Sequence, residues 1–112
     1  MKNTLGFLLA FLISLSLVAK NCEEPISEDR FNALYKSLTI KKNDQQRYLL
    51  IVAYAKRECI SAEQMKTFLK LFTDSKVKFS LVQNTYKLLF ESESKMLLLE
   101  GFTDRQQHLI TD

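Results

Sequence analysis

Residues 48–55 read YLLIVAYA, and this unbroken apolar run decides the fold class. On an α-helix with about 3.6 residues per turn, one face of the run carries Tyr48, Ile51, Val52 and Ala55. The other side, which a surface helix keeps polar, carries Leu49, Leu50, Ala53 and Tyr54. A helix that is apolar all round must be covered on both sides, so we expect this one to be a central element.

Two arrangements would cover such a helix. In the first, it lies between its hairpin partner and the later helices, as the middle helix of a stack. In the second, Leu50 and Tyr54, one turn apart, form an exposed anchor for a partner or for a second copy of the chain. The sequence favours the first arrangement and leaves the second open.

Other stretches repeat apolar residues at the i, i+3, i+4, i+7 spacing of an amphipathic helix. They are Phe31, Leu34, Tyr35 and Leu38; Met65, Phe68, Leu69 and Phe72; and Phe79, Val82, Tyr86 and Leu89. The spacing predicts helices over 27–38, 44–58, 61–72, 74–90, 94–101 and 104–111. Because short polar links join them, we expect an all-α protein, a compact stack of antiparallel helical hairpins with about six helices.

Similar strings open two of these helices. Ser27 and Ser61 are N-cap candidates, and Gln64 completes a capping box with Ser61. A second similarity relates residues 72–74 to residues 102–104, which both read FTD, and Asp44 precedes Asp74 at the same spacing. The similarities indicate either a repeat of two-helix units or the ordinary likeness of helix starts.

The first 19 residues differ sharply from the rest. Lys2 is followed by an apolar run from Leu5 to Ala19, which is too short for a comfortable membrane span. A charged start, a short apolar run and a small residue before a polar stretch describe a secretory signal peptide. We therefore expect cleavage after Ala19, a single helical domain over 20–112, and a secreted or periplasmic protein without a stable membrane span. An uncleaved anchor is the alternative, and a lipoprotein is a weaker one.

Cys22 and Cys59 are the two cysteines of the chain. Export would bring them into an oxidising compartment, and each precedes a predicted helix start in a neighbouring hairpin. We predict a Cys22–Cys59 disulfide, with a pair of free thiols as the alternative.

Reactive constellations are not evident in the sequence. The one histidine, His108, is close to the C-terminus, and Glu91, Glu93 and Glu100 are typical of polar helix surfaces. The cysteines and His108 lack zinc-site spacing, so we expect no catalytic, cofactor-binding or metal-binding residues. The net charge of +3 is small and interspersed, which does not favour nucleic acid as a partner. Lys66 and Lys70, with Lys76 and Lys78 beyond, form either a solvated face or a patch for an anionic surface.

The order of several strings resembles a known family. Residues 22–27 resemble a Cys-x-x-Pro-Met-Ser opening, and residues 59–66 resemble a Cys-Leu-Ser-x-x-Gln-Val-Lys string. Lys70-Leu71-Phe72, Lys78-Phe79, Tyr86 and Phe102-Thr103 resemble later segments. Over residues 22–112 the chain resembles the bacterial family called domain of unknown function 4476. The resemblance implies an exported bacterial protein with a compact helical domain, and it implies no activity.

Two hypotheses of function follow. The first is a non-catalytic secreted or periplasmic helical module that binds a protein or another envelope component, at Leu50 and Tyr54 if the anchor is external. The alternative is a small exported enzyme whose polar groups converge only in the folded chain. An enzyme would show a pocket with two neighbouring titratable residues, whereas a binding module would show an exposed apolar patch and no such pocket.

Overall fold

The computed structural model describes residues 22–112, so the predicted signal peptide and its cleavage site lie outside the described residues. Six α-helices and a 3₁₀ segment make up this part of the chain, and it contains no strand. The elements are α2 (Glu28–Thr39), α3 (Asp44–Ala55), α4 (Ala62–Leu69), α5 (Ser75–Thr85), η1 (Tyr86–Leu88), α6 (Ser94–Leu97) and α7 (Asp104–Thr111). The expectation of an all-α fold is confirmed. None of the described helices is long and apolar enough to cross a membrane.

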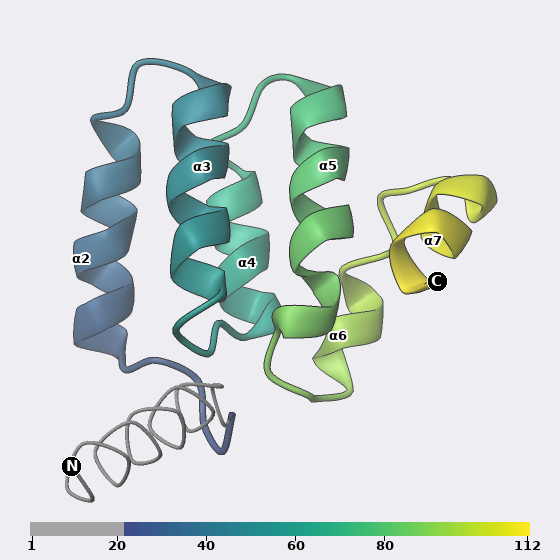
Figure 1. Ribbon diagram of the computed structural model, residues 1–112, viewed down its shortest axis with the longest axis horizontal. Helices are drawn as coiled ribbons and strands as arrows, with labels where there is room; N and C mark the ends of the chain where they lie inside the picture. Colours follow the sequence, from purple (N-terminus) through teal and green to yellow (C-terminus); the bar gives the residue numbers. More distant parts are fainter. Residues whose placement is uncertain (1–21) are drawn as a thin grey trace, which may run out of the picture.

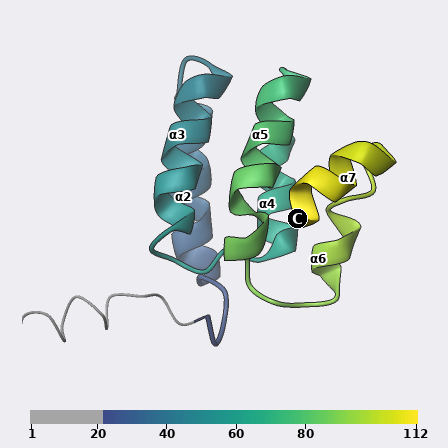
Figure 2. The same ribbon diagram turned by 45° about the vertical axis from the view of Figure 1, so that its right-hand side comes forward.

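The helices form two consecutive hairpins followed by a smaller C-terminal unit (Figure 1). In the first hairpin α2 runs antiparallel to α3, and in the second α4 runs antiparallel to α5. Helices α3 and α5 lie side by side at the front of the bundle, and α2 and α4 lie behind them (Figures 1 and 2). Helix α3 therefore packs between its hairpin partner α2 and the second hairpin, whose α5 lies beside it.

Caps set the starts of the helices. The Ser27 hydroxyl accepts a hydrogen bond from the Arg30 N–H at 3.3 Å, and Ser61 forms a capping box with Gln64, as the sequence predicts. A second capping box, between Thr103 and Gln106, opens α7. These caps satisfy backbone N–H groups that have no partner within the helix.

The core lies where the two hairpins meet. Its fully buried side chains are Leu38, Ile51, Ile60, Met65, Phe68, Leu81 and Val82. The predicted stripe of α2 joins this core: Leu34 and Leu38 are buried, and the Phe31 ring stacks on Phe68 of α4 with centroids 5.1 Å apart. Apolar residues of four helices, α2 to α5, therefore converge on one interior.

Several helices end earlier than the spacing predicts because their last turns tighten into 3₁₀ geometry. After α4, the N–H groups of Lys70, Leu71 and Phe72 each bond the carbonyl three residues back. The same pattern continues α6 as far as Phe102. Such turns give the last carbonyl groups of a helix a hydrogen-bond donor three residues ahead instead of four.

The three aspartates that suggest a repeat occupy different positions. Asp74 is the N-cap of α5, whereas Asp44 and Asp104 follow the N-caps Asn43 and Thr103. The Asp44 carboxylate is buried and accepts hydrogen bonds from the backbone N–H groups of Thr73 and Asp74. Asp44 therefore connects α3 to the start of α5. The three aspartates are not structurally equivalent, although their spacing in the sequence is regular.

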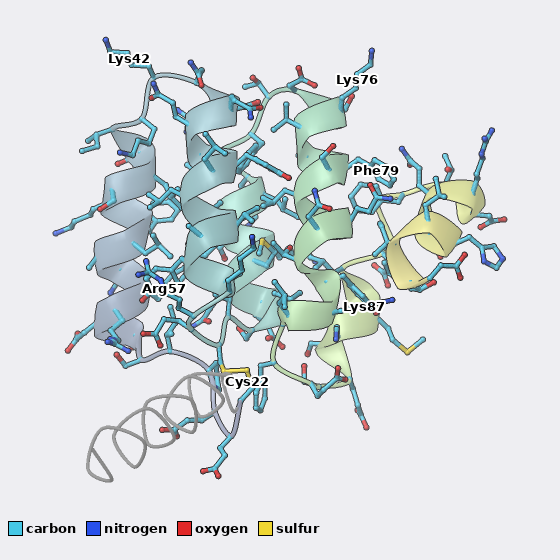
Figure 3. All side chains as sticks on the ribbon, in the orientation of Figure 1. Cys22, Lys42, Arg57, Lys76, Phe79 and Lys87 are labelled. Atoms are coloured by element: carbon cyan, nitrogen blue, oxygen red, sulfur yellow. A yellow bond between two sulfur atoms is a disulfide. The ribbon has the colours of Figure 1, made fainter. Side chains whose placement is uncertain are left out.

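A short segment at Cys59–Ile60 connects distant parts of the chain. The Ile26 N–H donates to the Cys59 carbonyl at 2.8 Å, and the Phe90 N–H donates to the Ile60 carbonyl at 2.9 Å. Beside these bonds Cys22 is joined to Cys59 by the predicted disulfide, with Cα atoms 5.5 Å apart (Figure 3).

Candidate functional site

Helix α3 meets a different environment on each side. Ile51 and Ala55 are buried in the core, and on the side of α5 the Tyr48 hydroxyl accepts a hydrogen bond from Asn84 Nδ2 at 2.6 Å. Leu49 is 58% exposed, and Ala53 is exposed as well. The apolar pattern of α3 thus serves contacts on three sides and leaves part of its fourth side open to solvent.

A groove between α2 and α3 is the candidate functional site. Its volume is about 470 Å³, and its apolar walls are formed by Ala33 and Leu34 of α2 and by Leu50 and Tyr54 of α3. Leu50 and Tyr54 are half-buried, since they pack against the core while facing the groove. The structure therefore brings the two predicted partner-binding residues together on one surface.

The orientation of α2 decides which of its residues reach the groove. Phe31 points toward α4, where its ring stacks on Phe68. Ala33 and Ser37, one turn apart on another side of α2, line the groove. Small side chains on this wall keep the groove open.

The two ends of the groove differ in charge. Arg30 lies at one end and forms an exposed salt bridge with Glu58, Nη1 to Oε2 3.3 Å. Lys41 lies at the other end, and among residues 22–112 its ammonium group forms no salt bridge. Because the groove walls include no aspartate or glutamate, the site complements an apolar ligand with negative charge near the Lys41 end.

The predicted acidic and histidine positions do not gather at this groove. His108 is exposed on α7, Glu93 is exposed before α6, and Glu91 binds Lys95 with Oε1 and Nζ 2.7 Å apart. Glu100 lines a different cavity. Within the described part of the chain, no three His, Cys, Asp or Glu side chains come together as a metal site would require.

The four predicted lysines separate in the fold. Lys66, Lys70 and Lys78 surround one cavity beside α4. Lys76 lines a groove between α3 and α5 instead.

Altered pKa values mark structural contacts outside the α2–α3 groove. Burial, and then the charge of Glu91, raise the pKa of Tyr86. A hydrogen bond with Ser94 is the main cause that lowers the pKa of Glu63. Neither group lines the groove, so these shifts describe how α4, η1 and α6 pack together.

No family model, curated protein or solved structure matches this chain. The resemblance to domain of unknown function 4476 therefore stays a prediction from the sequence.

Sequence reasoning missed the α2 wall of the site. Ala33, Ser37 and Lys41 are ordinary residues for an exposed helix face, and nothing in their spacing distinguishes them. The available signal was indirect, because the second apolar side of α3 requires a neighbour and α2 is the nearest helix in sequence.

Proposed function

We propose that the protein is an exported helical module that binds a partner protein in the α2–α3 groove. The observation that carries the proposal is that Leu50 and Tyr54 remain half-exposed in an apolar groove that has the ammonium group of Lys41 at one end. Grooves between antiparallel helices accept an amphipathic helix of a partner, which fills them with side chains one turn apart.

The partner that this groove fits is a short amphipathic helix with an acidic end. Helix α2 has 12 residues, which corresponds to a length of roughly 18 Å at 1.5 Å per residue. A partner helix of about three turns would match this length, with apolar residues against Leu50 and Tyr54. A carboxylate near one of its ends would face Lys41, and the other end would lie beside the Arg30–Glu58 ion pair.

Export is part of the proposal and rests on separate support. The first 19 residues have the charge and apolar pattern of a signal peptide, and the Cys22–Cys59 disulfide suits an oxidising compartment. The resemblance to domain of unknown function 4476 agrees with this location. If export is correct, mass spectrometry of the secreted protein gives Lys20 as its first residue.

Binding is tested with two synthetic helices that share one apolar stripe and differ in the charge of their ends. Fluorescence anisotropy should show that the acidic-ended helix binds and that the basic-ended helix does not. Ala33→Glu, which places a carboxylate on the groove wall, should weaken binding of the acidic-ended helix about tenfold.

Asn32→Glu is the matched control, because it adds the same charge on α2 at a position that does not line the groove. The proposal fails if both helices bind equally or if the two variants weaken binding equally. Self-association that Ala33→Glu abolishes would instead assign the groove to a second copy of the chain.

The enzyme alternative gains no support from the groove. Its walls carry no carboxylate, imidazole or thiol that would act as a nucleophile or as a general base.

A further inference from the structure

A second cavity lies between α4, α5 and residues 97–102, away from the α2–α3 groove. Its volume is about 470 Å³, within the roughly 300–1,000 Å³ typical of small-molecule sites. Leu69 and Leu98 are buried at its base, and Phe102 is half-buried beside them. The Phe102 ring packs edge-on against Phe79, with centroids 5.9 Å apart, which fixes this apolar wall.

The outer part of this cavity is positively charged. Lys66 and Lys70 of α4 and Lys78 of α5 line it, and Glu100 is the one acidic residue of the lining. Among residues 22–112 none of these three lysines forms a salt bridge. Their charge is therefore available to a ligand.

We propose that this cavity binds a single-chain anionic amphiphile, specifically a long-chain fatty carboxylate. The hydrocarbon chain would lie on Leu69, Leu98 and Phe102 and continue over Leu97, which is 53% exposed. The carboxylate would be held by the ammonium groups, which form charge-assisted hydrogen bonds with it.

Both parts of the cavity are needed to select this ligand class. A free phosphate ion would use the lysines and leave the apolar wall in water. A neutral hydrocarbon would use the wall and leave the charges without a partner. Each methylene group removed from water favours binding, so a longer chain binds more tightly as long as the apolar wall extends beside it.

Gly101 provides a way to block the cavity without disturbing the backbone. It lines the cavity, its φ is not positive, and an added Cβ would meet no heavy atom within 4 Å. A larger side chain therefore fits at this position, which lies in the lining of the cavity.

The test uses dodecanoate below its micelle concentration, titrated into the protein and followed by calorimetry and by amide chemical shifts. We expect saturable binding with shifts at residues 97–102. Gly101→Leu and Lys78→Gln should each weaken it at least about fivefold, because the first removes space and the second removes a charge. Lys36→Gln, on the exposed face of α2, should leave it unchanged.

Several results would overturn the proposal. Dodecyltrimethylammonium, with the same chain and a positive head, should bind at least about tenfold more weakly, and equal binding would refute the charge argument. Equal weakening by Lys36→Gln, or binding only to vesicles of anionic phospholipid, would also refute it. Ala33→Glu should not affect dodecanoate binding, so this test and that of the α2–α3 groove fail independently.

Discussion

One buried carboxylate, that of Asp44, connects the two helical hairpins. Its Oδ2 atom accepts hydrogen bonds from the Asp74 N–H at 2.7 Å and the Thr73 N–H at 2.9 Å, at the start of α5. Its Oδ1 atom accepts from Arg47 Nη1 at 3.0 Å. Arg47 also donates to the carbonyls of Leu38 and Lys41, which end α2. A single aspartate thereby fixes three helix ends at one point.

Replacing Asp44 with asparagine should lower the free energy of unfolding by about 1–3 kcal/mol. The amide oxygen can still accept from residues 73 and 74, but the amide nitrogen then faces Arg47, and two donors oppose each other. Urea denaturation measures the loss. Asp29→Asn is the control, because Asp29 is an exposed first-turn residue of α2 and its loss should cost less than about 1 kcal/mol.

Asp44 should also make stability depend on pH. Burial acts to raise the pKa of its carboxyl group, but hydrogen bonds from Asp74, Thr73 and Arg47 outweigh burial and bring the pKa below the ordinary 3.8. A lowered pKa stabilises the folded state at pH values above 3.8, and this stabilisation is lost as the pH falls through the folded-state pKa.

The stability difference between the native protein and Asp44→Asn should therefore be constant near neutral pH and shrink in acid. Urea midpoints collected from neutral pH down to the acid transition would show this trend. A difference that grew in acid would mean that Asp44 is not stabilised in its charged form.

At the scale of elements, α3 explains why an apolar run without a polar face is tolerated. Three consecutive residues meet three environments: Leu49 is mostly exposed, Leu50 lines the α2–α3 groove, and Ile51 is fully buried. The helix packs against α5 on one side and against its hairpin partner on another, and one flank contributes to the α2–α3 groove. The internal packing of the first arrangement is thus present, whereas partner binding at Leu50 and Tyr54 stays a prediction.

Alanine substitutions along this run should give a graded loss of stability. Leu49→Ala should change the free energy of unfolding by less than about 0.5 kcal/mol. Ile51→Ala should cost about 2–5 kcal/mol, because it leaves a cavity in the core. Leu50→Ala should fall between them, and thermal or urea unfolding measures all three. Equal costs at Leu49 and Ile51 would contradict the orientation of α3.

Helix starts could be predicted from the sequence because a cap is local. Ser27 and Ser61 bond N–H groups three residues ahead, so the signal and its effect lie within one turn. The end of α5 could not be predicted in this way. The chain leaves the helix near Thr85, and soon afterwards the Phe90 N–H bonds to Ile60, a partner far away in the sequence.

The residues of the candidate site also differ in whether the sequence could identify them. Leu50 and Tyr54 could be identified, because their apolar character on a second helix face is visible in the sequence. Ala33, and Gly101 of the second cavity, could not be identified, because a small side chain does not indicate how much space lies beside it. That space depends on how neighbouring elements pack.

At the scale of the whole molecule, the Cys22–Cys59 disulfide closes a loop with a sequence separation of 37 residues. In the chain-entropy account, a cross-link over such a loop stabilises the folded state by about 3–4 kcal/mol through its effect on the unfolded chain. The loop contains both helices of the first hairpin, so the bond restrains this hairpin as a unit.

Replacing both cysteines with serine should lower the free energy of unfolding by about that amount. Reduction of the native protein should give the same loss, and the double variant should not respond to reductant. Urea titrations with and without reductant measure both effects. A native protein whose midpoint is unchanged by reduction would show that the bond adds no stability.

The contacts that Ile26 and Phe90 make with the Cys59–Ile60 segment also influence the order in which parts of the chain can fold. Helices and hairpin turns form from neighbouring residues within microseconds, whereas pairing Ile26 with Cys59, or Phe90 with Ile60, requires long loops to close first. Each hairpin can therefore form before these long-range contacts do. Oxidation of the cysteines holds the first of these loops closed. The Cys59–Ile60 segment, with which Phe90 must pair, is then already fixed beside the first hairpin.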